Sequence, residues 1–312
     1  MNILITGSCG MLGQYLCKHL AKKNNIFKIS KRNIIEDQYL SIDFLDFKYN
    51  SIRKLKKFVQ PDIIIHAAAI KQVDSAEYNA LEYIKTNIYG AENVIEASIY
   101  NNVKKVIALS TDKASSPVNL YGGTKLCSDK LFVAANLYVG KNIFSVVRYG
   151  NVFGSRGSVI PFFLDLINKK QKLIITDPEM TRFNIDLDDA VKLVVNATKN
   201  SVGGEIFVPK ISSYRIMDIV KAIQNKKDIK IVGIRPGEKL HEELISRAEG
   251  YNTFDLGNFF IIAGNEKSIN ICKKRKYKKF KVGLNYNSLD NPFLTIAQIK
   301  KLIENYKKKL RS

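Results

Sequence analysis

Two nearby stretches of the chain carry side chains that could transfer protons. The first, Ser110–Lys113, follows the apolar run 106–109, whose composition predicts a buried strand. The second begins a helical pattern with Tyr121 and Lys125, which are four residues apart and therefore lie on one helix face. Open parallel sheets bind their ligands where the strands end, so we expect both stretches to face a ligand. The candidate catalytic residues are Thr111, Asp112, Lys113, Tyr121 and Lys125.

These residue types indicate proton and hydride transfer. A lysine ammonium favours the phenolate form of a nearby tyrosine, which can then take a proton from a substrate hydroxyl while hydride leaves the same carbon. Blander interpretations also fit: Tyr121 and Lys125 could form a solvated helix face, Asp112 could cap a turn, and Lys113 could be a solvated base. A dinucleotide-binding pattern upstream favours the chemistry.

That pattern lies at the N-terminus. Ile3–Thr6 predicts a short strand, and three glycines in the spacing GxxGxxG and a helical pattern follow it. Glycine is required where the backbone turns tightly and approaches a pyrophosphate, and a helix N-terminus offers that pyrophosphate free N–H groups. Small residues after the third predicted strand, 61–65, would also let the backbone approach a cofactor. The expected contacts are Gly7, Gly10, Met11, Leu12, Gly13, Ala67, Ala68 and Ala69.

The end of the second predicted strand, 26–29, bears on which dinucleotide binds. NAD enzymes place a carboxylate there for the ribose hydroxyls, whereas this chain has Ser30, Lys31 and Arg32. Cations suit the 2′-phosphate of NADP, so the sequence predicts NADP, with NAD as the alternative if these are ordinary surface bases. Further candidates, at the adenine edge, are Asp43 and Phe44.

Strands alternate with helices through about residue 150. This order predicts an α/β fold with a Rossmann-type, doubly wound parallel sheet and right-handed crossovers. We expect residues 1–150 to form the NADP-binding Rossmann domain, together with the helix and strand in 186–208. Residues 151–312 then form mainly a smaller C-terminal substrate domain, with a helix at 295–306. Residues 250–290 give weak signals.

Composition is that of a globular protein. The 312 residues are 46% hydrophobic and 25% charged. No apolar run is long enough for a membrane span and no signal peptide precedes the first strand, so we expect a cytoplasmic protein without a membrane partner. The four cysteines lack the spacing of metal ligands, and no metal is expected. The net charge of +21 would suit nucleic acid, but the lysines are spread along helices and the dense run 273–281 is typical of a solvated segment, so no such partner is expected.

Taken together, these motifs resemble the extended short-chain dehydrogenase/reductase family. Within it the chain is most similar to the inverting UDP-N-acetylglucosamine 4,6-dehydratases that open pseudaminic acid synthesis. The resemblance implies a Rossmann-type fold with a smaller nucleotide-sugar-binding domain, bound NADP, and a homo-oligomer, either a dimer or a hexamer. The segments that carry it are 7–13, 66–71, 85–88, 110–129, 148–163, 176–183, 204–210 and 233–242.

The resemblance also implies roles for the candidate catalytic residues. Tyr121 takes the proton from O4 of the sugar while hydride leaves C4, and Lys125 favours the phenolate and holds the nicotinamide ribose. Thr111 orients O4, Lys113 removes the C5 proton, and Asp112 protonates the leaving C6 hydroxyl. For this, partial burial and the charge of Lys125 should lower the pKa of Lys113, while a low-dielectric pocket should raise that of Asp112.

Further contacts follow from the same resemblance. Lys71 and Asn87 are expected at the cofactor, and arginines are expected at the substrate diphosphate because their forks match phosphate oxygens; any of these arginines could instead form a surface ion pair. The chain departs from the family at Asn184, where an aromatic residue is common. The expected substrate contacts are Lys71, Asn151, Arg156, Ser158, Val159, Thr181, Arg182, Lys210, Arg235 and Glu238.

Two competing functions remain at this point. A UDP-sugar 4-epimerase or reductase, or a retaining 4,6-dehydratase, would use Thr111, Tyr121 and Lys125 equally well, although an epimerase has little use for Asp112 and Lys113. A non-catalytic NADP-sensing regulator could share the fold. The intact pair Tyr121 and Lys125 argues against it.

Overall fold

The computed structural model of the protein describes residues 1–30, 39–41, 59–138, 140–155, 157–223, 229–281 and 283–311. The expected cofactor and substrate contacts that lie outside these ranges are Lys31, Arg32, Asp43, Phe44 and Arg156.

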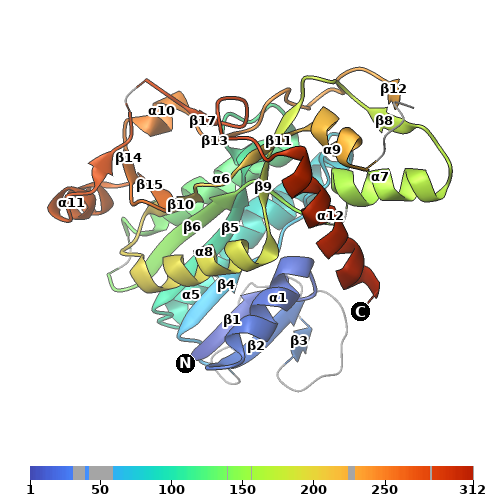
Figure 1. The fold of residues 1–312 in the computed structure, drawn as a ribbon. Coiled ribbons are helices and arrows are strands. Elements are labelled where there is room, and N and C mark those ends of the chain that lie inside the picture. Colours follow the sequence, from blue (N-terminus) through green and yellow to red (C-terminus); the bar gives the residue numbers. More distant parts are fainter. Residues whose placement is uncertain are drawn as a thin grey trace.

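A ten-stranded sheet forms the centre of the described structure (Figure 1). Its strands, in spatial order, are β16 (Lys278–Lys279), β14 (Thr253–Asp255), β15 (Phe259–Ala263), β10 (Glu205–Pro209), β6 (Ile143–Tyr149), β5 (Lys105–Thr111), β4 (Ile63–His66), β1 (Asn2–Thr6), β2 (Asn25–Ser30) and β3 (Tyr39–Ser41). Neighbours from β3 to β10 are parallel, and β15, β14 and β16 extend the sheet with antiparallel pairs. The predicted α/β fold with a Rossmann-type parallel sheet is confirmed.

Helices cover both faces of this sheet. On one face, α5 (Gly90–Tyr100) and α6 (Leu120–Ala135) pack through Val94 and Phe132. On the other face, α1 (Met11–Leu20) and α8 (Leu187–Asn200) pack through Leu16 and Val194 (Figure 1). A strand covered on both faces is buried at every position, which explains the three isoleucines of β4 and the burial of His66 at its end.

The helical stretch expected at 80–100 is not uniform. It consists of α4 (Ala80–Tyr83), a π-helical segment (Ile84–Tyr89) and α5. A π-helix is rare and tends to occur at functional sites. Here it carries the expected cofactor residue Asn87.

A smaller lobe is built from the C-terminal half. Its three-stranded sheet has β9 (Thr181–Ile185) between β7 (Asn151–Val152) and β11 (Ser213–Arg215). Phe163, Ile219 and Ile299 belong to its core. The other elements of this lobe are α7 (Val159–Asn168), β8 (Leu173–Ile175), α9 (Ile216–Ile223), β12 (Ile229–Ile231) and α12 (Ile296–Arg311).

Strands on both sides of residue 150 contribute to the large sheet, since β10, β14, β15 and β16 all belong to it. Sequence signals at 250–290 are weak because β14 and β16 have only three and two residues. The remaining elements are α3 (Val73–Ala76), a 3-10 helix (Asp112–Ala114), β13 (Glu243–Ile245), α10 (Arg247–Gly250), α11 (Glu266–Lys274) and β17 (Tyr286–Asn287).

The described ranges contain no helix with both the length and the apolar character that crossing a membrane requires. Within the same ranges, no three or more His, Cys, Asp and Glu side chains gather in a way that could hold a metal ion.

Candidate active site

The glycine turn at residues 7–13 has the shape that a dinucleotide requires. Gly7 has a φ of 66°, and a Cβ atom there would lie 2.7 Å from the backbone nitrogen of Ala68. A Cβ at Gly13 would collide with the carbonyl oxygen of Gly7. Gly10, the N-cap of α1, has no side chain that could cap the first turn, so at this position nothing competes with an anion for the first N–H groups of the helix. The turn therefore fits a pyrophosphate.

The loop after β4 is fixed beside this turn. Asn87 is buried, and its side-chain amide forms two 3.0 Å hydrogen bonds with the backbone of Ile70. It also donates to the Thr124 hydroxyl on α6 at 3.1 Å. Asn87 thus connects this loop, which carries Ala67–Ala69 and Lys71, to α6. Ser30 is buried at the end of β2.

The catalytic segment begins where β5 ends. The Thr111 side chain accepts a hydrogen bond from the Lys113 backbone N–H and so starts the 3-10 helix. Asn119 caps α6 by accepting from the Gly122 backbone N–H at 2.7 Å. This start turns Tyr121 and Lys125 inward, where they are 7% and 3% exposed. A solvated helix face is therefore excluded.

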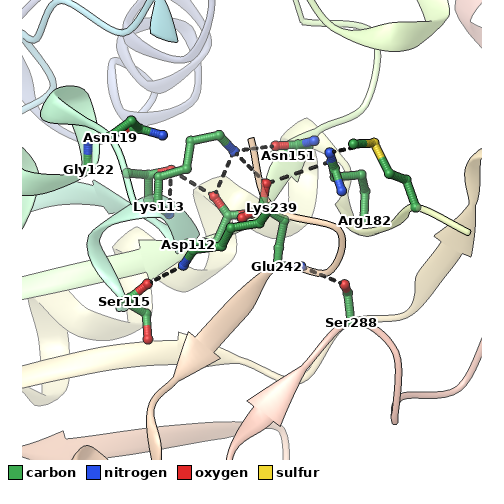
Figure 2. Close-up of polar contacts among 12 residues, drawn as sticks. Asp112, Lys113, Ser115, Asn119, Gly122, Asn151, Arg182, Lys239, Glu242 and Ser288 are labelled. Carbon is green, nitrogen blue, oxygen red and sulfur yellow. Dashed lines mark hydrogen bonds and ion pairs between the residues drawn. The ribbon is translucent and has the colours of Figure 1, made fainter. Parts of the chain in front are cut away.

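Asp112 lies at the centre of the cluster in Figure 2. It is fully buried, and its Oδ1 accepts from the Thr111 hydroxyl at 2.8 Å and from Lys113 Nζ at 3.2 Å. Its Oδ2 is buried without a hydrogen-bond partner. Burial raises the pKa of Asp112, although the Lys113 charge opposes the shift. The expected direction is confirmed.

The expectation for Lys113 is wrong in this structure. Its Nζ lies 3.3 Å from Glu242 Oε1 and 3.4 Å from Asn151 Oδ1, in addition to the contact with Asp112. Burial favours the neutral amine, but the Asp112 and Glu242 carboxylates outweigh burial and raise the pKa of Lys113. The closest charges are therefore negative, and they favour the ammonium form of Lys113.

Tyr121 also differs from the expectation. Burial raises its pKa to about 12, and the strongest opposing influence is the charge of Lys113, followed by a hydrogen bond with Thr111. Lys125, which was expected to favour the phenolate, donates instead to the Leu109 carbonyl oxygen at 2.9 Å. The cation that acts most on the phenol is therefore the one on the 3-10 helix.

Sequence reasoning missed Glu242, which precedes β13 and is 3% exposed. A loop from the C-terminal half brings it to the site: the Asn119 side chain donates to the Gly237 carbonyl oxygen at 2.7 Å, and Lys239 Nζ donates to that of Ser115 at 2.6 Å. Glu242 Oε1 also lies 3.7 Å from Arg182 Nε. The charges in 233–242 were visible in the sequence, but nothing in it indicated that this carboxylate is buried against Lys113.

Two of the expected substrate contacts reach this cluster. Asn151 accepts from Lys113, and Arg182 pairs with Glu242 (Figure 2). The Arg182 guanidinium also donates to the carbonyl oxygens of Thr181 and Leu240, so part of its fork is used within the chain.

The other expected substrate contacts interact with residues outside this cluster. Arg235 pairs with Asp74 at 3.4 Å. Lys210 pairs with Asp255 at 2.6 Å. The remaining placements are Thr181, whose buried hydroxyl bonds His241 and Ser288, Glu238, which accepts from the backbone of Arg235, and Ser158 and Val159, which begin α7.

Comparison with known proteins identifies similar chains along almost the whole length. The family model described as "Polysaccharide biosynthesis protein" matches residues 3–264. An inverting UDP-N-acetylglucosamine 4,6-dehydratase from Campylobacter jejuni serotype O:2 is 46% identical, over 97% of this chain and 96% of that protein. A UDP-glucose 4-epimerase from Rickettsia bellii is 38% identical over 97% and 95%.

Solved structures agree with the fold. The X-ray structure of Pen from Bacillus thuringiensis superposes with a TM-score of 0.86 at 31% identity and covers 97% of both chains. More distant structures of this fold, at 17–18% identity and TM-scores of 0.73–0.74, include nucleotide-sugar enzymes with NAD bound.

Proposed function

The chain belongs to the polysaccharide biosynthesis protein family, and on that premise we propose that it is a hydro-lyase of the extended short-chain dehydrogenase/reductase type. Its substrate is UDP-N-acetylglucosamine, and its product is the UDP-4-keto-6-deoxy sugar with inverted configuration at C5. The observation that carries this proposal is the contact between Asp112 and Lys113 beside Tyr121. Water loss needs an acid and a base next to the group that oxidises C4.

The first step belongs to Tyr121 and Thr111. In its phenolate form, which the Lys113 charge favours most, Tyr121 takes the O4 proton as hydride leaves C4. The Thr111 hydroxyl, which is hydrogen-bonded to this tyrosine, orients O4. A nicotinamide dinucleotide held at the glycine turn would supply the hydride acceptor for C4 and the hydride donor for C6. The residues that would hold it are the glycines of 7–13, Ala67–Ala69 and Lys125.

The elimination step explains how a lysine with a raised pKa can act as a base. The reaction needs a neutral Lys113 amine and a protonated Asp112, whereas the resting pair is ionic. Transfer of one proton from Lys113 Nζ to Asp112 Oδ1, across 3.2 Å, produces both required forms without any exchange with solvent. The buried position of Asp112 favours its neutral form and so assists this transfer.

The two proton transfers of the elimination then balance within the pair Asp112 and Lys113. Lys113 takes the C5 proton, the bond between C6 and its oxygen breaks, and Asp112 gives its proton to the departing hydroxide, which leaves as water. Lys113 is then an ammonium and Asp112 a carboxylate, so the resting ion pair is restored. The hydride would then be delivered to C6. Tyr121 releases to solvent the proton that it took from O4, and one solvent proton is added to C5 from the opposite face, which inverts that centre and completes the proton balance.

Finer assignments belong to the same proposal. Ser30, Lys31 and Arg32 favour NADP over NAD, and competitive binding of the two dinucleotides would decide between them. Asn151, which contacts Lys113, is proposed near the sugar, and Arg235 is proposed near the diphosphate. A homo-oligomer, a cytoplasmic location and a place at the start of pseudaminic acid synthesis are proposed from the family resemblance.

The test is to incubate the purified protein with UDP-N-acetylglucosamine in deuterated water and to analyse the product by mass spectrometry and NMR. We expect loss of one water, one deuterium at C5 and inverted C5 geometry. A product with retained C5 geometry would indicate a retaining dehydratase. An unchanged substrate would contradict the proposed substrate.

A second candidate function is a UDP-sugar 4-epimerase, which is the name of relatives that are 38% identical. Epimerisation at C4 uses the tyrosine but requires neither the acid Asp112 nor the base Lys113, because no water is lost. The same experiment separates the two, because epimerisation changes the configuration at C4 and leaves the number of oxygen atoms unchanged.

A further inference from the structure

Three oxygen atoms surround the Lys113 nitrogen in the structure. They are Asp112 Oδ1 at 3.2 Å, Glu242 Oε1 at 3.3 Å and Asn151 Oδ1 at 3.4 Å (Figure 2). An ammonium has three N–H groups, one for each oxygen. After one proton has moved to Asp112, two N–H groups remain for Glu242 and Asn151. The lone pair left behind points toward Asp112 Oδ1, which now carries the proton, and it becomes free to take another proton once that carboxyl turns toward the departing hydroxyl.

Glu242 differs from Asp112 because it is a buried carboxylate that neither gains nor loses a proton in the proposed reaction. It is 3% exposed, and its Oε2 is buried without a hydrogen-bond partner. Its backbone N–H donates to the Ser288 hydroxyl at 2.9 Å, which fixes the residue where β13 begins. A buried carboxylate left partly unsatisfied is costly, so its position calls for a function.

The charge of Glu242 is maintained by its neighbours. Burial would raise its pKa, but the positive charges of Lys113, Arg182 and Lys239 outweigh burial and hold the pKa below its usual range. When Lys113 gives its proton to Asp112, the Arg182 guanidinium, 3.7 Å from Glu242 Oε1, still favours the Glu242 carboxylate. The titratable and charged groups that face this site are Asp112 and Lys113 on the 3-10 helix, Tyr121 on α6, Arg182 on β9, Tyr214 on β11 and Lys239 on the same loop.

We propose that Glu242 is a positioning residue for the Lys113 base: through Oε1 it holds the amine so that the lone pair faces C5 of the sugar. This role rests on the proposed dehydratase function. It gives the second lobe a direct part in the chemistry, because the residue arrives on the loop that is attached to Ser115 and Asn119.

The variant Glu242→Gln tests this role. It keeps an oxygen near Lys113 but removes the charge, so we expect the rates of C5 deuterium incorporation and of water loss to fall about tenfold to hundredfold. The Glu242 charge raises the pKa of both Asp112 and Lys113. Both limbs of the plot of kcat against pH should therefore move to lower pH. A purely structural role would lower the amplitude and leave the limbs in place.

Two further variants make the result specific. Glu242→Asp keeps the charge, but its shorter side chain moves the carboxylate oxygen away from Lys113 Nζ. Turnover should therefore fall, while the pH limbs stay close to those of the wild type. Glu205→Gln is the matched control. Glu205 is also buried, at the start of β10, and it accepts from the Ser145 hydroxyl on β6 and from the backbone N–H groups of Val202 and Gly203 in the turn before β10. The control should lower the melting temperature without moving either limb.

Unmoved pH limbs and an unchanged rate of C5 exchange in folded Glu242→Gln protein would overturn the proposal. Failure of the dehydratase assignment gives a different result, since the wild-type protein itself would then release no water from UDP-N-acetylglucosamine. If Glu242→Gln does not fold, the pH profile of Glu242→Asp still decides. This variant keeps the charge, so a clear displacement of its pH limbs would contradict a role that depends on charge.

Discussion

Two buried charge clusters lie close together in this molecule and are built differently. The site cluster consists of Asp112, Lys113, Arg182 and Glu242. The second, which we call the Arg148 cluster, joins fully buried Arg148 to Asp129 at 3.2 Å and to Glu249 at 3.0 Å.

The difference is in how the carboxylates are satisfied. In the Arg148 cluster, Asp129 also accepts from the Ser110 hydroxyl at 2.8 Å, and Glu249 completes a capping box with Ser246. Among the described side chains, the unpartnered atom of that cluster is Arg148 Nε, whereas the site cluster leaves one oxygen of Asp112 and one of Glu242 buried without a partner. Among the described residues, buried carboxylate oxygens without a partner therefore occur in the site cluster and not in the Arg148 cluster, which fits the proposal that the site cluster binds a substrate.

The largest effect should come from Lys113→Ala. Removal of the base should lower the rate of water loss about 10²- to 10⁴-fold, while the dinucleotide still binds at the glycine turn. Turnover by product mass and dinucleotide binding by fluorescence measure the two properties. Wild-type-like turnover would show that Lys113 is not the base. The difference between the two clusters would then have no catalytic meaning.

Arg148→Met should have the next largest effect, and on stability rather than on chemistry. It leaves Asp129 and Glu249 buried without their cation, which costs about 3–5 kcal/mol of unfolding free energy. Urea denaturation measures the loss. At temperatures where the variant is folded, turnover per molecule should stay close to that of the wild type, and a selective loss of turnover would show that this cluster is not merely structural.

Asp112→Asn should have the smallest effect on stability, within about 1 kcal/mol of the wild type or slightly stabilising. The substitution removes a charge that burial disfavours, and Glu242 still neutralises the Lys113 ammonium. Urea denaturation checks this value in parallel with Arg148→Met. A loss as large as that of Arg148→Met would mean that both clusters hold the fold together in the same way.

Much of the fold could be predicted because its signals are local. The strand at 3–6, the glycine spacing and the helix after it follow from composition and periodicity over short windows. The strands at 253–255 and 278–279 could not be found in this way, because they are too short to show a period. Their place in the sheet depends on pairing with other segments: Phe254 lies opposite Ile261 in the next strand and opposite Lys279, which is much further along the chain.

The site was predictable where its residues are neighbours in sequence. Thr111, Asp112 and Lys113 follow one another, and the helical spacing relates Tyr121 to Lys125. The pKa of Lys113 was not predictable, because its sign depends on Glu242, more than a hundred residues further along the chain. Electrostatics in a buried site is set by whichever charges the fold brings closest, and sequence distance gives no measure of that.

The loop at 232–242 has a consequence for efforts to redesign the enzyme. Its contacts with Ser115 and Asn119, together with the carboxylate that it brings to Lys113, make it part of both lobes. A chimera that exchanges the smaller lobe in order to accept another sugar must therefore place its fusion points outside this loop. Otherwise the loop and the 3-10 helix have to be exchanged together. A graft that cuts through it would combine two intact halves and still lack an active site.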